Sequence, residues 1–280
     1  MYMKHKQVQG ATSTPHVFSF SQIKTYQTCP YQYKLRHILK LPTQGKYYFS
    51  FGTSIHSTLQ KFYERIKELN LPKQDSLFGF LQEKPSVTSN IRVPFLDELY
   101  ALYEIHWIDE WYQNIVQREE YYKKGKEILR IFYASQEGKW TIPVNLESWF
   151  NIKVGGTSLH GRIDRIDQLP DGTLEIIDYK TGQVKETLTA DDKEQLLIYQ
   201  IAAETLPEYK HMGKTSKLTF YYLNDNIQTS FVGTDTDLER LRGKVTEAAD
   251  GIKAGDFRAE PNPHTCKYCD FREICEYRAK

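Results

Sequence analysis

Hydrophobic positions recur at helical spacing in the first quarter of the chain. Ser19 or Ser21 can cap a first helix (SQIKTYQTC), and Pro30 can open a second (PYQYKLRHIL), because proline is tolerated at the first helical position. Over residues 51–69, FGTSIHSTLQKFYERIKEL, apolar residues fall three or four positions apart, which predicts a helix with one buried face. The residues of this buried stripe are Phe51, Ile55, Leu59, Phe62 and Ile66.

The next stretch predicts a helical insertion between less regular segments. Residues 1–15 are expected to form a loose arm, and residues 70–94 a loop that contains three prolines. Residues 95–136 are rich in aromatic side chains and predict long helices (FLDELYALYEIHWIDEWYQNI and the stretch through ILRIFYASQ). We therefore expect residues 70–136 to be an insertion that covers one side of a sheet.

After Trp140 the pattern changes to that of strands. LESWFNIKV, SLHGRIDRIDQL and TLEIIDYK predict three strands, which are joined by the tight turns Gly-Gly and Pro-Asp-Gly. A helix is expected over residues 193–206, a hairpin over 217–233 and a last helix over 237–255. This order of helices and strands predicts an α/β (α+β) domain built around one mixed sheet.

Composition narrows the class of protein further. Of 280 residues, 40% are hydrophobic and 26% are charged, which is typical of a folded globular protein. The net charge is only +1, so any nucleic-acid surface must be local. The polar N-terminal segment has no apolar region of a signal peptide, and no stretch reaches the roughly 18 apolar residues of a membrane span. We expect a cytoplasmic protein with no membrane partner.

Two aspartates and a lysine are the strongest candidates for chemistry. In a regular strand Asp164 shares a face with Ile166, and in the next strand Asp178 shares a face with Lys180. The intervening turn can bring Asp164, Asp178 and Lys180 together at one end of the sheet. Two close carboxylates repel each other unless a cation lies between them, and carboxylate oxygens suit Mg²⁺ or Mn²⁺. A lysine could orient or help deprotonate a metal-bound water, or neutralise charge at the phosphorus, so the three residues predict phosphodiester hydrolysis.

Asp164 followed by Asp178-Tyr179-Lys180 resembles the D…(D/E)-x-K core of the PD-(D/E)xK nuclease superfamily, and GRIDRID with DYKTG is similar to its RecB-like branch. The resemblance implies a restriction-endonuclease-like core, with a central mixed sheet flanked by helices, in a single domain over residues 1–280. It also implies that His56, on an upstream helix, binds the metal ion. The implied metal ligands are His56, Asp164, Asp178 and the backbone carbonyl of Tyr179.

Gln195 and Tyr199 match the Q-x-x-x-Y that follows the lysine in the RecB-like branch. They are one helical turn apart and therefore project from one face. The resemblance implies that this face lies against the active site and the DNA backbone, and that Gln195 and Tyr199 hold the scissile strand.

The four cysteines suggest a second cofactor. Three lie in the C-terminal segment 264–280 as C-x2-C-x5-C, and one lies far upstream. Such clustering in a protein expected to be cytoplasmic favours metal or cluster ligation over disulfides. The pattern is similar to that of AddB-type helicase–nuclease subunits and CRISPR-associated four-cysteine exonucleases, which implies a [4Fe–4S] cluster that joins the two chain ends. Zinc is the less favoured alternative, since its sites usually pair two C-x-x-C knuckles. The proposed ligands are Cys29, Cys266, Cys269 and Cys275.

Several residues keep two interpretations open. Glu147 either adds a carboxylate to the metal site or lies on the surface, and Asp167 is expected to face away from Asp164 in a structural or salt-bridging role. A basic and aromatic run near the first cysteine either stacks on bases of single-stranded DNA or is a chance cluster. This run consists of Tyr26, Tyr31, Tyr33, Lys34, Arg36 and Lys40.

The resemblance implies a metal-dependent DNA exonuclease that acts on single-stranded ends in repair or recombination, since the histidine accompanies exonucleolytic action in this family. It also implies a possible helicase partner or CRISPR adaptation partner. Two alternatives remain, a CRISPR-associated spacer-processing nuclease and a non-catalytic DNA-binding scaffold subunit of a helicase–nuclease complex. The presence of every expected catalytic residue argues against the scaffold.

Overall fold

The computed structural model describes residues 17–71 and 91–279 of the chain. It divides them into two compact units. The terminal unit contains the described parts of 1–44, 151–160 and 240–280, and the sheet unit contains those of 45–150 and 161–239. The expected arm over residues 1–15 and most of the expected loop over 70–94 lie outside the described residues. The expectation of one domain over 1–280 stays a prediction.

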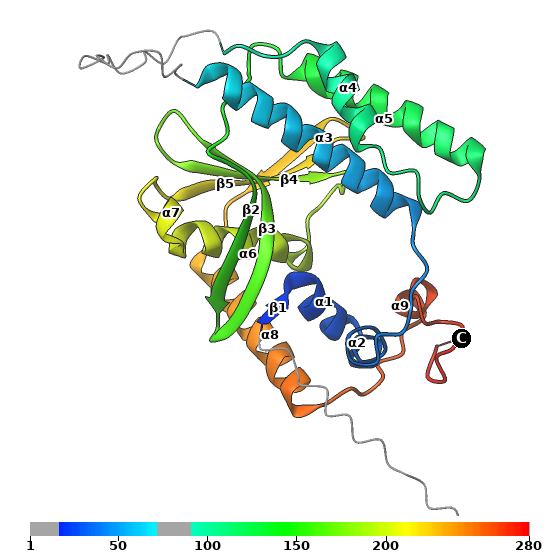
Figure 1. The fold of residues 1–280 in the computed structure, drawn as a ribbon. Coiled ribbons are helices and arrows are strands. Elements are labelled where there is room, and N and C mark those ends of the chain that lie inside the picture. The colour runs from blue at the N-terminus through cyan, green and yellow to red at the C-terminus, as the bar shows by residue number, and fades with distance from the viewer. Residues whose placement is uncertain (1–16, 72–90, 280) are drawn as a thin grey trace, which may run out of the picture. The chain divides into compact units, whose positions relative to one another are not determined.

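Among the described residues, six strands form one mixed sheet (Figure 1). The sequence predicted the mixed sheet and five of these strands, but not the short first strand. The strands are β1 (Val17–Ser19), β2 (Asn145–Val154), β3 (Thr157–Gln168), β4 (Leu174–Lys180), β5 (Thr215–Tyr222) and β6 (Ile227–Phe231). Their order is β1-β3-β4-β5-β6, and β2 pairs with β3 off this path. The β1–β3 and β4–β5 pairs are parallel, whereas β3–β4 and β5–β6 are antiparallel.

Helices occupy most of the remaining described residues. They are α1 (Phe20–Thr28), α2 (Pro30–Tyr33), the π-helix η1 (Lys34–Ile38), α3 (Tyr47–Asn70), α4 (Leu96–His106), α5 (Ile115–Ser135), α6 (Ala190–Thr205), α7 (Pro207–Lys210), α8 (Asp235–Ala254) and α9 (Pro263–Lys267). Ser19 caps α1, and its side chain and that of Gln22 satisfy each other's backbone N–H groups. No helix within 17–71 or 91–279 has the length and apolar character needed to cross a membrane.

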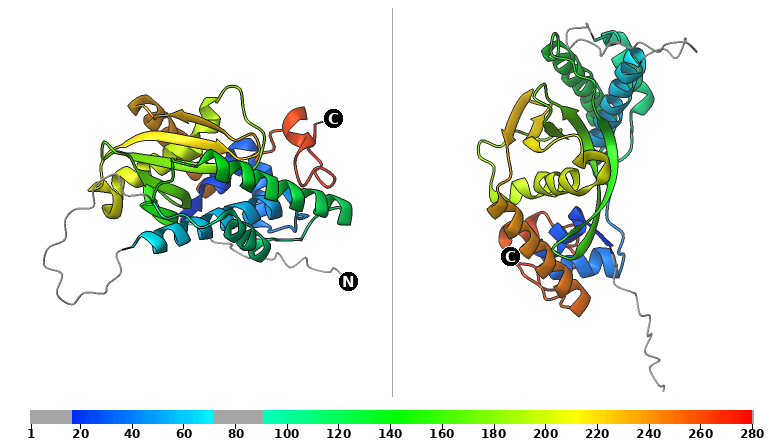
Figure 2. Two further views of the ribbon diagram at one scale, coloured as in Figure 1. Left: turned by 90° about the horizontal axis from the view of Figure 1, so that it is seen from above. Right: turned by 90° about the vertical axis from the view of Figure 1, so that its left-hand side faces the viewer.

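Within the sheet unit, helices cover both faces of the central strands. Figures 1 and 2 show α3, α4 and α5 on one face and α6 on the other. The predicted apolar stripe of α3 is fully buried, and it packs with α4 and α5 against Ile177, Tyr179 and Tyr221 of β4 and β5. Burial of this stripe supplies most of the reason for α3 to form, because helices gain their stability chiefly from tertiary packing.

The helix predicted from residue 95 onwards ends earlier than expected. It stops at His106, and the chain then runs irregularly to Asn114. The hydroxyl of Ser54 accepts a hydrogen bond from the Ile108 N–H at 2.9 Å, and that of Ser50 donates to the Glu110 carbonyl at 2.8 Å. We call the irregular segment between α4 and α5 the break. Because its backbone groups find hydrogen-bond partners on α3, tertiary contacts override the local helix propensity of this segment.

Candidate active site

Asp164 and Asp178 lie on the antiparallel strands β3 and β4, whose register pairs Arg165 with Ile177. That register places the two aspartates opposite each other, because cross-strand partners share a face. Asp178 is only 2% exposed, and the Asp164 carboxylate accepts a hydrogen bond from the Tyr179 N–H at 2.9 Å. The structure thus brings together the two carboxylates that the sequence singled out.

His56 reaches this pair from α3. Its Nδ1 lies 3.3 Å from Oδ2 of Asp164, and its side chain is 27% exposed. Burial opposes the charged imidazolium, but the charge and hydrogen bond of Asp164 outweigh it and raise the pKa of His56 to about 9. Burial likewise opposes ionisation of Asp164, but the His56 charge and the Tyr179 N–H lower the pKa of that carboxyl. In the metal-free protein the two residues form an ion pair.

Glu147 of β2 completes a cluster of possible metal ligands. One ligand atom each from His56, Glu147 and Asp164 lies within 4.8 Å of the others. The Glu147 carboxylate also accepts a hydrogen bond from Arg162 at 3.0 Å, and burial followed by the Asp164 charge raises its pKa. Glu147 has a φ of 48°, which is rare outside glycine and concentrates at functional sites. The structure therefore supports the metal-site interpretation of Glu147 over the surface one.

Lys180 lies two residues beyond Asp178 on β4, on the same face of the strand. Its Nζ is 2.6 Å from Oδ2 of Asp178. Burial raises the pKa of Asp178 to about 6, although the Lys180 charge opposes this. Burial disfavours the charged lysine, but Asp178 outweighs it and raises the pKa of Lys180 above its ordinary value. Lys180 is therefore a cation at neutral pH, which suits it to orient water or neutralise phosphate charge rather than to accept a proton.

Gln195 and Tyr199 of α6 extend the site. Lys180 Nζ donates a hydrogen bond to Oε1 of Gln195 at 2.9 Å, and Nε2 of Gln195 donates to the Tyr199 hydroxyl at 2.8 Å. Asp178, Lys180, Gln195 and Tyr199 thus form one chain of polar contacts. Gln195 positions the lysine in this structure, and its expected contact with DNA remains a prediction.

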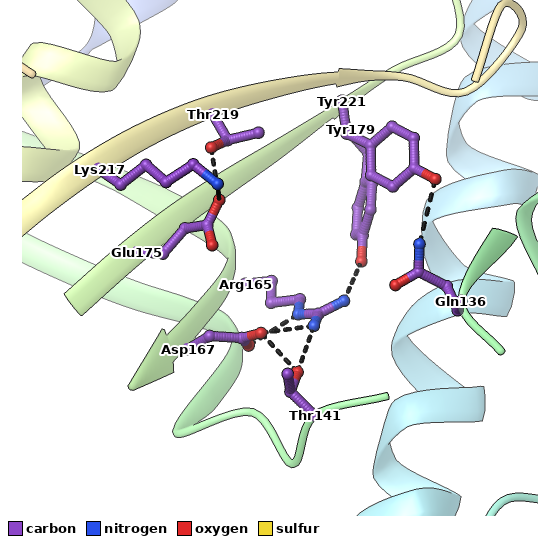
Figure 3. A network of polar contacts seen from close by, with 9 residues as sticks. All are labelled: Gln136, Thr141, Arg165, Asp167, Glu175, Tyr179, Lys217, Thr219 and Tyr221. Atoms are coloured by element: carbon purple, nitrogen blue, oxygen red, sulfur yellow. Dashed lines mark hydrogen bonds and ion pairs between the residues drawn. The ribbon is translucent and has the colours of Figure 1, made fainter. Parts of the chain in front are cut away.

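A buried polar network lies on the face of β3 and β4 opposite to that of Asp164 and Asp178 (Figure 3). Arg165 pairs with Asp167 through two hydrogen bonds of 2.7 and 2.5 Å and also donates to the Tyr179 hydroxyl at 3.0 Å. Thr141 bonds to both members of the pair. Asp167 thus faces away from Asp164 in a salt bridge, as the strand alternation suggested. Arg165 was not predicted from the sequence, although its position two residues before Asp167, on the same face of the strand, was a signal.

The four cysteines are in the terminal unit, where they line one pocket together. All four are half-buried free thiols. Burial raises the pKa of Cys269, and the nearby Cys275 and Cys29 add to this. Four sulfur donors around a single pocket fit a [4Fe–4S] cluster or a zinc ion. Arg36 of η1 forms an ion pair with Asp270, so a charged contact also joins the segment after Cys29 to the C-terminal segment.

The basic and aromatic run near Cys29 does not present all its rings for stacking. Tyr26 is 8% exposed and Tyr33 is fully buried. The two rings contact each other edge to face, and Tyr33 also stacks on Phe257. Burial excludes both from contact with DNA bases, so the stacking interpretation fails for these two tyrosines.

Comparison with known proteins places the chain in a family. The model for the PD-(D/E)XK nuclease superfamily matches residues 17–276, and the chain belongs to this superfamily. It is 25% identical to the Gene 69 protein of Mycobacterium phage L5, over 92% of this chain and 95% of that protein.

Two further similarities are informative. The chain is 25% identical to a subunit of the ATP-dependent helicase/deoxyribonuclease of Clostridium perfringens SM101, over 88% of this chain but only 23% of that protein. The fold is similar to a crystal structure of a protein from Eubacterium rectale, with a TM-score of 0.53 and 13% identity over 100% of this chain and 96% of that one.

Proposed function

We propose that this nuclease is a metal-dependent deoxyribonuclease that degrades DNA from single-stranded ends. The observation that carries the proposal is the convergence of His56, Glu147 and Asp164 within 4.8 Å beside the ion pair of Asp178 and Lys180. Carboxylates, one imidazole and a fixed cation are the groups that phosphodiester hydrolysis needs.

Mg²⁺ or Mn²⁺ suits the donors of this site. The proposed ligands are His56, Asp164, Asp178 and the backbone carbonyl of Tyr179, and Glu147 is the carboxylate that the structure adds. Hard divalent ions favour carboxylate oxygens and keep open positions for water and phosphate. A bound ion would supply Lewis-acid activation of the phosphodiester and of its attacking water.

The chain's own residues have distinct roles in this proposal. His56 loses its proton to act as a ligand, since only the neutral imidazole coordinates a metal. Lys180 stays charged and stabilises negative charge at the scissile phosphate, while Gln195 holds its ammonium in place. Tyr199 supports Gln195 from the same face of α6.

DNA as the substrate and a helicase as a possible partner are supported by the Clostridium perfringens relative, which is named as part of a helicase/deoxyribonuclease. Matching only 23% of that protein, the chain corresponds to one part of it. A role in DNA repair or recombination follows as part of the proposal.

We further propose that Cys29, Cys266, Cys269 and Cys275 hold a structural [4Fe–4S] cluster. Their convergence on one pocket of the terminal unit supports this. Zinc is the alternative occupant, and an anaerobic preparation distinguishes them, because a cluster absorbs visible light whereas zinc does not.

The nuclease proposal is tested with single-stranded DNA labelled at its 5′ or its 3′ end, with and without Mn²⁺. We expect release of short products from one end only when metal is present. Lys180→Ala should abolish cleavage and leave the fold intact, while Lys153→Ala, which removes an exposed lysine of β2, should cleave normally. Cleavage by Lys180→Ala at the normal rate would contradict the mechanism.

A further inference from the structure

Large apolar side chains are exposed at the N-terminal end of α3 and in the break between α4 and α5. Tyr48 is 45% exposed, Phe49 57% and Trp111 52%. The rings of Tyr48 and Phe49 lie 4.7 Å apart between centroids. We call these three residues the aromatic platform. Exposed aromatic groups of this size in one region usually mark a binding surface.

Trp111 is held at the surface by an unusual backbone. Its φ is 67°, in the left-handed region that a bulky residue rarely adopts. A Cβ atom placed on Gly45 would lie only 2.3 Å from the Trp111 ring, so the indole packs directly on that glycine. Backbone strain of this kind persists at sites where the surrounding structure over-determines it, and such sites are commonly functional.

A less exposed ring, Tyr47, contacts the Tyr48 ring of the platform at 5.7 Å between centroids. Tyr47 contacts Tyr121 at 4.8 Å and Tyr112 at 6.1 Å between ring centroids. Lys46 places its ammonium 5.8 Å from the centre of the Tyr48 ring. Because Tyr47 contacts the Tyr48 ring and Gly45 packs against the Trp111 ring, these two side chains lose little entropy when a flat ligand stacks on the platform.

One member of the platform, Phe49, lies on the same side of α3 as His56 of the candidate active site. Phe49, Gly52 and His56 are three and then four residues apart, so they lie on the same side of the helix. The rise of an α-helix separates Phe49 from His56 by about 10 Å along the axis. Gly52 has no side chain, and a Cβ there would meet only the Thr181 hydroxyl, at 3.4 Å. Gly52 therefore leaves no side chain between Phe49 and His56 on this side of the helix.

We infer that the aromatic platform stacks on unpaired bases of the substrate strand, whose backbone continues past Gly52 to the candidate active site. Paired bases in a duplex hide their faces, whereas every unpaired base offers one, so a stacking surface selects single strands without selecting sequence. The near-neutral net charge makes stacking more important, because the global field attracts DNA little. The inference rests on the proposed nuclease function.

The first experiment measures binding of a fluorescent oligothymidine to the full chain in EDTA, which prevents cleavage. Phe49→Ala and Trp111→Ala should each raise the Kd about tenfold, within the range known for loss of one base-stacking ring. The matched control is Phe95→Ala, because Phe95 is 83% exposed but lies away from the platform. It immediately precedes α4, and the first turn of α4 contacts the C-terminal part of α3, whereas the platform is at the N-terminal end of α3. Phe95→Ala should bind as the wild type does. Thermal melting checks that all variants fold.

A second experiment places a single abasic nucleotide at successive positions of the oligonucleotide. In the wild type, one or two positions should weaken binding more than the others. In Phe49→Ala or Trp111→Ala this extra loss should disappear at one of them, because no ring remains for that base. Uniform abasic effects that are equal in wild type and variants would overturn the inference.

The hydrolysis of bis(p-nitrophenyl) phosphate with Mn²⁺ separates the platform from the active site, because this substrate has no bases. The platform variants should hydrolyse it normally while cleaving the oligonucleotide with a raised KM. Equal loss of both activities, or oligonucleotide binding as in the wild type, would overturn the platform. Hydrolysis of neither substrate by the wild type would reject the nuclease function, and the binding comparison would still decide whether the rings stack on bases.

Discussion

The protonation states of the site's residues depend on one another. Asp164 raises the pKa of His56, and His56 in turn lowers that of Asp164. The pKa of Asp178, which is deeply buried beside Lys180, is raised instead, chiefly by burial. A divalent ion would replace the His56 proton as the positive charge among these carboxylates.

The raised pKa of His56 predicts a pH dependence of stability in the metal-free protein. Its ordinary pKa of 6.5 rises to about 9 on folding, so its stabilising contribution is complete below pH 6.5 and is lost as the pH passes through 9. In EDTA the free energy of unfolding should fall by up to about 3 kcal/mol across this window. Urea titrations of wild type and His56→Asn measure this, and an equal fall in both would contradict it.

The Arg165–Asp167 pair predicts a large cost when one partner is removed. Both side chains are 4% exposed, so Asp167→Ala leaves a buried guanidinium without its counter-charge. We expect the free energy of unfolding to fall by about 3 to 5 kcal/mol, measured in urea. Asp250→Ala is the matched control, because Asp250 is 66% exposed in its pair with Lys253 and should cost less than about 1 kcal/mol. Similar costs for both variants would show that the buried pair is not special.

At the scale of elements, close packing between α4 and α5 depends on one glycine. A Cβ on Gly125 would lie 2.0 Å from the hydroxyl of Tyr103, which is fully buried. Glycine normally weakens a helix, so its presence within α5 reflects this contact with α4. The two helices approach as closely as they do because no side chain separates them.

Gly125→Ala should therefore destabilise the protein, even though alanine favours helix formation. Overpacking against Tyr103 should cost about 1 to 3 kcal/mol of unfolding free energy. Tyr103→Phe removes the atom nearest the new methyl group and should restore part of the loss in the double variant. Gly243→Ala in α8 is the control, since nothing lies within 4 Å of its added Cβ. It should stabilise by up to about 1 kcal/mol, and a similar gain for Gly125→Ala would disprove the contact.

At the scale of the whole molecule, residues from both ends of the chain meet in the terminal unit. Cys29 and the three C-terminal cysteines line one pocket there, and Arg36 pairs with Asp270. The sheet unit, by contrast, holds the candidate nuclease residues and its own apolar core. The residues of the proposed cluster and those of the proposed chemistry thus belong to different units of the chain.

The proposed cluster predicts a shared phenotype for its ligands. Cys29→Ser and Cys275→Ser should each lose visible absorbance and iron and melt at a lower temperature. A cross-link between Cys29 and the C-terminal cysteines closes a loop that spans most of the chain. In the chain-entropy model such a cross-link contributes on the order of 5 kcal/mol to the free energy of unfolding. Lys180→Ala should keep both the absorbance and the iron. Zinc instead of iron in the purified wild type would reject the cluster.

The sequence by itself determined the elements and most of the candidate site. Alternation along the strands before and after a Pro-Asp-Gly turn predicted that Asp164, Asp178 and Lys180 would converge, and the structure brings them together. The apolar stripe of α3 was equally predictable, and it leaves His56 beside the buried face. Such features follow from periods of two and 3.6 residues and from one tight turn, which are all local.

Only the tertiary structure decided which residues from distant parts of the sequence join these candidate site residues. It brings Glu147 to the site on a strained backbone and pairs Arg165 with Asp167 beneath Tyr179. It also ends α4 at His106, where serines of α3 bond the following backbone, and it holds Trp111 at the surface. These outcomes depend on contacts between residues far apart in sequence, whose free energies exceed local preferences and leave no periodic pattern to read.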